Sequence, residues 1–221
     1  MPEAAPHIRV VEMPRPMRIA IVGGTGAFGR ALAARLRDQG LDVAIGSRDA
    51  VRARELGSTI GVDSGTNEGV VRVADYVVLA VQSSAAVGTA RALAGAIGRK
   101  PVLCVASDLH FGGDGVSPGR NEGSIAEDVA NAVAAPVASG FQAIPAAHLA
   151  RAEPLEEDVL VCGDASAKEP ALEFGARLVT GRAIDAGPLA NSRALEAMTA
   201  VILHVNRTYK VVAGLRVTGF E

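Results

Sequence analysis

The segment IAIVGGTGAFG, from Ile19 to Gly29, carries the strongest chemical signal in the chain. Its glycines have the spacing Gly24-x-Gly26-x-x-Gly29, after an apolar run and before a segment with helical periodicity. Gly24 then permits a tight turn, Gly26 lets the backbone approach a pyrophosphate, and Gly29 lets the helix pack on the strand. The helix N-terminus offers free N–H groups to phosphates, and Thr25 adds a hydroxyl. These residues predict a dinucleotide site; the alternative is a strand-to-helix turn without a ligand.

Basic residues after the second predicted strand favour the phosphorylated nicotinamide dinucleotide. This strand ends in the run IGSR, without an acid at Gly46 or Ser47 to accept hydrogen bonds from ribose hydroxyls. Ser47 can donate to a phosphate, and Arg52 follows Arg48 by one helical turn, so the two guanidiniums can converge on one. Asp49 comes after Arg48 and is expected to cap the short helix. We predict NADP(H) as the nucleotide; the alternative is a solvated, charged helix.

The elements that position these residues alternate between apolar runs and amphipathic segments. Strands are predicted at 18–22, 42–45, 76–81, 101–106, 137–141 and 159–162, and helices at 27–39, 49–56, 85–97, 124–134, 169–179 and 191–213. In the helix at 124–134, Ser124 is the expected N-cap and Glu127 its capping-box partner. Alternation of this kind predicts an α/β fold, a Rossmann-type doubly wound and mostly parallel sheet, with a small helical C-terminal part.

The composition limits the class of protein. The chain has 221 residues, 49% of them hydrophobic and 21% charged, which excludes global disorder and fits one large domain. A net charge of −2 excludes a nucleic-acid module that relies on a basic field. No apolar run reaches the ~18–20 residues that cross a membrane. Since the first sixteen residues lack a signal-peptide pattern, we expect a cytoplasmic protein.

The chain is expected to divide into three parts. Residues 1–16 contain four prolines and are interpreted as a flexible arm. Residues 17–145 are the predicted NADP-binding Rossmann domain. Residues 146–221 are expected to extend the sheet and to add the long C-terminal helix. This part is predicted to bind the second substrate and to form the dimer contact. That helix carries a broad apolar stripe, which can pack either across a homodimer interface or against its own domain.

Other reactive side chains give weaker signals. Cys104 and Cys162 lie inside apolar runs, which favours buried thiols over a disulfide or a nucleophile. His110 lies in a glycine-rich segment, 108–123, of the length that often forms a lid or binding loop. His148 and His204 lie on predicted helices. We predict no catalytic side chain and no metal site.

The start of the last helix has two interpretations. Asn191 or Ser192 following Pro188 is typical of a helix cap, but the same groups can bind a ligand. Arg193 in a first turn opposes the helix dipole, so a partner anion is expected. That anion is either a carboxylate of the protein, for which Asp185 is a candidate, or the substrate.

Five stretches of the chain resemble a known family. RIAIVGGTGAFGRALAARL, VAIGSRD, FQAIPAAHLA, VCGD and DAGPLANSRALEAMTAVIL resemble NADPH-dependent reductases of the deazaflavin coenzyme F420. The resemblance covers Met17 to about Arg207, and its second half is the more specific. It implies an oxidoreductase that transfers a hydride between NADP(H) and coenzyme F420. The alternatives are an NADPH-dependent reductase of another carbonyl or imine, and a non-catalytic NADP-binding regulatory protein.

The resemblance also implies roles for single residues. The expected nucleotide-binding residues are Gly24, Thr25, Gly26, Phe28, Gly29, Ser47, Arg48, Arg52 and Val81, with Ala143, Ile144, Pro145 and Ala146 supporting the nicotinamide. The expected second-substrate residues are Gln142, Asn191, Arg193 and Thr199. The chain departs from archaeal members at two positions, with Gln142 in the place of a His and Ala197 in the place of a Ser. Gln142 keeps hydrogen-bonding capacity and Ala197 does not, which motivates the alternative substrates.

Overall fold

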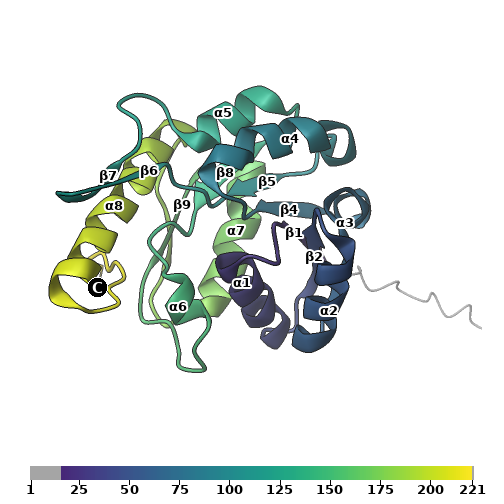
Figure 1. The fold of residues 1–221 in the computed structure, drawn as a ribbon, viewed down its shortest axis with the longest axis horizontal. Coiled ribbons are helices and arrows are strands. Elements are labelled where there is room, and N and C mark those ends of the chain that lie inside the picture. Colours follow the sequence, from purple (N-terminus) through teal and green to yellow (C-terminus); the bar gives the residue numbers. More distant parts are fainter. Residues whose placement is uncertain (1–15, 221) are drawn as a thin grey trace, which may run out of the picture.

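A single eight-stranded sheet forms the centre of the molecule (Figure 1). The structure is a computed structural model that describes residues 16–220, so fifteen of the sixteen residues of the predicted arm lie outside the described part. The strands of the sheet are β1 (Arg18–Val22), β2 (Asp42–Ser47), β3 (Asp63–Thr66), β4 (Tyr76–Leu79), β5 (Val102–Cys104), β8 (Val137–Gly140), β9 (Val159–Gly163) and β10 (Ala183–Asp185). The helices are α1 (Ala27–Asp38), α2 (Ala50–Ile60), α3 (Asn67–Val73), α4 (Ser83–Ile97), α5 (Ile125–Ala132), α6 (Ala146–Leu149), α7 (Ala165–Leu178) and α8 (Ser192–Tyr209).

The strand order β10-β9-β8-β5-β4-β1-β2-β3 confirms the predicted doubly wound topology. The chain winds outward from β1 through β2 to β3, then returns to β4 on the other side of β1 and continues through β5 to β8. Only the pairing of β8 with β9 is antiparallel, so the sheet is mostly parallel, as predicted. The order reverses between β1 and β4, and ligands of such sheets bind at the carboxyl ends of the strands beside that point.

Helices cover both faces of the sheet because the strand residues are apolar on both. Within β1, Ile19 and Ile21 pack with α1 and α7, while Ala20 and Val22 pack with α3, α4 and α5. All four side chains are fully buried. The second face is built largely from Ala and Val, which lets the helices lie close to the strands.

The glycine-rich segment 108–123 is not a structureless loop, and this corrects the sequence-based expectation. It forms an antiparallel hairpin of β6 (Leu109–Gly112) and β7 (Gly115–Pro118). Gly115, at φ +123°, closes the turn in a conformation that favours glycine. The hairpin lies beside α8 (Figure 1), with Val116 buried in the contact.

Several element bounds also differ from the sequence-based expectation. Helix α7 begins at Ala165 rather than at residue 169, so Pro170 lies inside the helix instead of in its first turn. Helix α8 ends at Tyr209, four residues earlier than expected. Strands β3 and β10 and helix α3 were not predicted. Among the described helices, none has the length and apolar character that crossing a membrane requires.

Candidate functional site

The glycine-rich turn after β1 is shaped by contacts that leave no room for side chains. Gly23 has φ +80°, so the tight turn lies at Gly23 and not at Gly24, where the glycine spacing predicts it. Gly24 is required for a different reason, since a Cβ there would lie 2.6 Å from the Cβ of Ile45 on β2. At Gly29 a Cβ would lie 2.8 Å from the carbonyl oxygen of Gly23, which confirms that this glycine allows close helix packing.

The N-terminus of α1 is left free to receive an anion. Gly26 is the N-cap in an extended conformation, and it has no side chain to cap the helix. The first turn of α1 also contains no acidic residue. The first backbone N–H groups and the positive end of the helix dipole therefore point toward the turn, as a phosphate site requires.

A groove of about 730 Å³ brings the predicted phosphate-binding residues together. Its lining includes Thr25 and Gly26 from the turn and Ser47, Arg48 and Arg52 from the end of β2 and the start of α2. The Thr25 hydroxyl donates to Ser47 Oγ at 3.4 Å, so both hydroxyls face the same space. These groups form a cluster of donors suited to a phosphate.

Neither guanidinium in this groove is neutralised by a neighbour. Arg48 and Arg52 are exposed, and neither forms an ion pair with any residue in the described range 16–220. Asp49 caps α2, as predicted, because its carboxylate accepts the backbone N–H groups of Val51 and Arg52 at 2.9 and 3.1 Å. This acid is therefore engaged by the backbone, and the two cations are available to an anionic ligand.

A second cavity of about 300 Å³ adjoins the groove at the carboxyl ends of β4, β5 and β8. The two spaces share the lining residues Ala80, Val81 and Gln82, so they form one continuous site. The other predicted residues that line the cavity are Phe28, Gln142, Ala143, Ile144, Pro145, Ala146 and Thr199. Most of the lining is apolar, which keeps water away from a bound ring system.

Gln142 lines this cavity and carries a buried hydrogen-bond acceptor without a partner among the described residues. Its Nε2 donates to Ser139 Oγ at 2.7 Å and to the Cys104 carbonyl at 3.4 Å. A carbonyl only accepts, so this contact fixes which end of the amide faces β5. The opposite atom, Oε1, is buried and has no hydrogen-bond partner among the described residues. A buried acceptor without a partner is costly, and a ligand N–H group would satisfy it.

Thr199 on α8 closes the same cavity from the C-terminal side. Its hydroxyl lies 3.0 Å from Ser107 Oγ and donates to the Gln142 carbonyl at 3.3 Å. Residues 107 and 142 follow β5 and β8, so this one side chain connects α8 to two strand ends.

Asn191 and Arg193 do not join the residues that line the cavity. Asn191 Nδ2 donates to the Ala186 carbonyl at 2.7 Å. Arg193 does have an anionic partner, but it is Glu127, at 3.0 and 3.1 Å. Asp185, the intramolecular partner considered from sequence, instead pairs with Lys168 at 2.7 Å. Substrate contacts of Asn191 and Arg193 stay predictions.

The predicted N-cap positions of α8 and α5 are both confirmed, but only the cap of α5 makes a hydrogen bond with its side chain. Asn191 is the N-cap of α8, but its side chain makes no capping bond, and Ser192 already belongs to the helix. Ser192 Oγ lies 2.6 Å from Ser124 Oγ instead. Ser124 caps α5, as predicted, by accepting the Glu127 backbone N–H at 3.0 Å.

Both cysteines are buried and unpaired, as predicted. Burial raises the pKa of Cys104 to about 12 and that of Cys162 to about 11, so neither forms a thiolate near neutral pH. His110 is exposed on the hairpin. Over residues 16–220 no group of three or more His, Cys, Asp or Glu side chains is arranged to hold a metal ion.

Sequence reasoning missed several residues that line the site: Gly23, Asn67, Gln82, Ser107, Leu203 and Asn206. Asn67 was missed because β3, whose sequence DSGT has no large apolar residue, gives no strand signal. Asn67 lines the groove with Ser47, and its Oδ1 is buried beside Gly46 without a partner among the described residues. Asn67 is therefore a second residue of the site with an unsatisfied buried acceptor.

Comparison with known proteins agrees with this architecture. Residues 18–107 match the model of a family described as NADP oxidoreductase, coenzyme F420-dependent. The F420-dependent NADP reductase of Methanothermobacter thermautotrophicus is 34% identical over 220 residues, covering 91% of this chain and 95% of that protein. The enzyme of the same name from Methanocaldococcus jannaschii is 32% identical, covering 93% and 100%.

A solved structure from Arthrobacter sp. FB24 has the same fold, with a TM-score of 0.81 and 23% identity. The superposition covers 92% of this chain and 100% of that one. The matches at 32–34% identity span nearly the whole chain, including the turn after β1 and the cavity at Thr199. The chain therefore belongs to the family of F420-dependent NADP reductases.

Proposed function

We propose that this protein is an oxidoreductase that transfers a hydride between NADP(H) and the deazaflavin coenzyme F420. The observation that carries the proposal is that the phosphate-binding groove continues into the apolar cavity through Val81. The relatives at 32–34% identity are named F420-dependent NADP reductases, which supports the same function. When bound, the two cofactors would supply the carbon centres that donate and accept the hydride. The protein contributes proximity, orientation and exclusion of water rather than a proton donor.

Four side chains are proposed to hold the phosphorylated end of NADP(H). Arg48 and Arg52 supply charge, and Thr25 and Ser47 supply hydroxyl donors in the same groove. The N-terminus of α1 is proposed to hold the pyrophosphate, because its N–H groups are uncapped by side chains. These donors favour NADP(H) over NAD(H), since only the former carries a 2′-phosphate.

The nicotinamide and the deazaflavin are proposed to meet in the adjoining cavity. Phe28, Val81 and the residues Ala143, Ile144, Pro145 and Ala146 supply an apolar wall for the rings. Gln142 Oε1 is proposed to accept a hydrogen bond from a ring N–H, because it otherwise has no partner among the described residues. Ala197, the second departure from the archaeal pattern, lines a different hollow on the outer face of α8.

That outer face is proposed to form a homodimer interface. It holds an apolar hollow of about 550 Å³ lined by Val116 and Pro118 of the hairpin and by α8 residues including Met198 and Val201. Val201 is 58% exposed at this hollow, and a contiguous exposed apolar patch is typical of a protein–protein contact. The division into a nucleotide-binding part, 17–145, and a second-substrate part, 146–221, and the cytoplasmic location also stay predictions.

The proposal is tested by mixing NADPH with oxidised coenzyme F420 and following the visible absorbance of the deazaflavin. Loss of absorbance with NADPH, and a much slower loss with NADH, is the expected result. No loss while NADPH still binds tightly would contradict the proposal. A screen of carbonyl and imine substrates would then separate another reductase from a non-catalytic NADP-binding regulator.

A further inference from the structure

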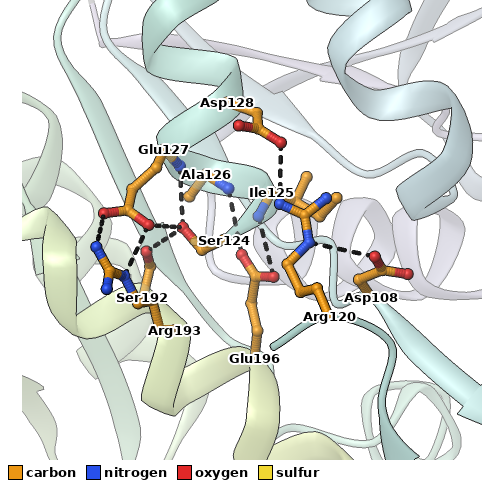
Figure 2. A network of polar contacts seen from close by, with 10 residues as sticks. All are labelled: Asp108, Arg120, Ser124, Ile125, Ala126, Glu127, Asp128, Ser192, Arg193 and Glu196. Carbon is orange, nitrogen blue, oxygen red and sulfur yellow. Dashed lines mark hydrogen bonds and ion pairs between the residues drawn. The ribbon is translucent and has the colours of Figure 1, made fainter. Parts of the chain in front are cut away.

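A carboxylate from α8 completes the N-terminus of α5 (Figure 2). The backbone N–H groups of Ile125 and Ala126, the first two residues of α5, donate to Glu196 Oε2 and Oε1 at 3.1 and 3.2 Å. The third N–H, of Glu127, donates to Ser124 Oγ at 3.0 Å. The N-cap side chain therefore satisfies only one of the three donors, and the other two depend on a residue about 70 positions later in the chain.

Glu196 makes these contacts away from solvent, with 4% of its surface exposed. Burial raises the pKa of its carboxyl group, while the backbone N–H groups of Ile125, Ala126 and Asp108 and the Arg120 guanidinium act in the opposite direction. A buried carboxylate is retained only where donors surround it, so this one acts as a fixed link between elements. Both of its oxygens accept a backbone hydrogen bond.

The same face of α8 carries Thr199, one helical turn after Glu196. The Thr199 hydroxyl lies 3.0 Å from that of Ser107, so this face of α8 meets the chain that leaves β5. Side chains three apart on a helix lie on one face and move together. The position of Glu196 therefore fixes where Thr199 stands in the cavity.

We propose that Glu196 is a positioning residue for the second-substrate wall, acting through Thr199. By holding the start of α8 against the N-terminus of α5, it sets the distance between α8 and the ends of β5 and β8. It touches neither the groove nor the cavity. The predicted effect of Glu196 on the KM for the deazaflavin rests on the proposed function. Its predicted effect on the hydrogen exchange of α8 does not.

Three other contacts in Figure 2 hold neighbouring parts of this network. The buried hydroxyl groups of Ser124 and Ser192, 2.6 Å apart, join the N-cap of α5 to the first residue of α8, but by a single hydrogen bond. The pair Arg193–Glu127 also joins α8 to α5, but the Arg193 side chain is 57% exposed, where an ion pair contributes little. Arg120 binds Asp108 and Asp128 and so joins the hairpin segment to α5, without reaching α8. Glu196 is the buried contact of this network that spans α5 and α8 with two hydrogen bonds.

The first test measures amide hydrogen exchange of the free protein for Glu196→Gln. An amide side chain keeps one acceptor oxygen and places an NH₂ group against a backbone N–H, so one donor of α5 loses its partner. We expect exchange of the first α5 turn and of α8 around Thr199 to rise about tenfold, the equivalent of one lost hydrogen bond to a charged group. The matched control is Asp128→Asn, which removes a carboxylate of α5 that pairs with Arg120 and should leave the exchange of α8 unchanged.

The second test measures KM for each substrate of the same two variants. For Glu196→Gln the KM for oxidised coenzyme F420 should rise about tenfold, while the KM for NADPH changes less than about twofold. Unchanged exchange in α8, or parallel increases in both KM values, would overturn the inference. If the unmodified protein does not reduce coenzyme F420, the proposed function fails, and the exchange measurement alone decides the role of Glu196.

Discussion

The hydroxyl oxygens of Thr199 and Ser107 lie 3.0 Å apart, and this contact joins α8 to the chain that leaves β5. Sequence separates the two residues by 92 positions, yet both line the cavity proposed for the deazaflavin. The C-terminal helix is thus part of the site and not only a cover for the sheet.

Replacing Thr199 by Val is expected to impair the second substrate selectively. The variant keeps the shape of the side chain but removes the hydroxyl that contacts Ser107 and the Gln142 carbonyl. Loss of a neutral hydrogen bond of this kind should raise the KM for coenzyme F420 about three- to tenfold and leave the KM for NADPH unchanged. Thr199→Ser, which retains the hydroxyl, is the control. An equal loss in both Thr199 variants would contradict the assignment.

Replacing both Arg48 and Arg52 by Ala is expected to weaken NADPH binding by ~2–4 kcal/mol, since each charge-assisted contact contributes ~1.5–3 kcal/mol and such losses are not additive. NADH binding should barely change, because NADH lacks the 2′-phosphate. Calorimetric titration with each dinucleotide measures the difference. Arg54→Ala is a matched control, because Arg54 is exposed on the same helix and does not line the groove. Equal losses for the two dinucleotides would refute the phosphate assignment.

Gly29→Ala is expected to destabilise the fold and displace α1. Its Cβ would lie 2.8 Å from the Gly23 carbonyl oxygen and 2.9 Å from the Gly24 Cα, both backbone atoms. Overpacking of this kind costs ~1–3 kcal/mol. At the exposed Gly95 of α4 a Cβ would meet nothing within 4 Å, so Gly95→Ala should instead stabilise by ~0.5–1 kcal/mol. Denaturant unfolding of both variants measures the contrast, and a neutral Gly29→Ala would show that α1 can move away freely.

The segment after α8 is expected to detach in acid. Burial opposes ionisation of Asp158, but the backbone N–H groups of Val217 and Arg182, both at 2.8 Å, together with the Arg182 side chain, hold its pKa below the ordinary value. A lowered carboxyl pKa adds stability that is present above the unfolded-state pKa and is lost as the pH falls through the folded-state pKa.

The free energy of unfolding should therefore fall steeply below about pH 4, where an unperturbed Asp begins to protonate. In Asp158→Asn this part of the pH dependence should disappear, and the variant should be less stable at pH 7. Chemical unfolding at a series of pH values is the measurement. An identical pH profile for the variant would mean that Asp158 does not hold the segment.

Val201→Asp is expected to abolish the proposed dimer without unfolding the protein. The substitution places a charge in the apolar hollow beside Met198, where a second copy would have to desolvate it. Val73→Asp is the control, since Val73 is similarly exposed, at 57% against 58% for Val201, but lies on α3. Sedimentation equilibrium should show a monomer only for Val201→Asp. A monomeric unmodified protein would contradict the interface.

The sequence was sufficient for the central sheet because its strands are buried on both faces. A continuous apolar run such as YVVLAV is typical of a buried parallel strand, and the glycine spacing after β1 places the nucleotide at a known edge of the sheet. The hairpin β6–β7 and the strand β3 escaped prediction because each strand has only four residues, contains glycine and is largely exposed. The partner of Arg193 was also unpredictable, because Glu127 lies 66 residues away and only tertiary packing brings the two together.

The most direct measurement of the central claim is isotope transfer. NADPH deuterated at the transferable position of its nicotinamide is mixed with oxidised coenzyme F420 in ordinary water, and the reduced deazaflavin is analysed by NMR. Because the two rings are proposed to meet in one water-excluding cavity, the deuterium should appear on the reduced deazaflavin carbon. A reduced deazaflavin that carries hydrogen from the solvent, or none formed while NADPH is bound, would contradict direct transfer between the two cofactors.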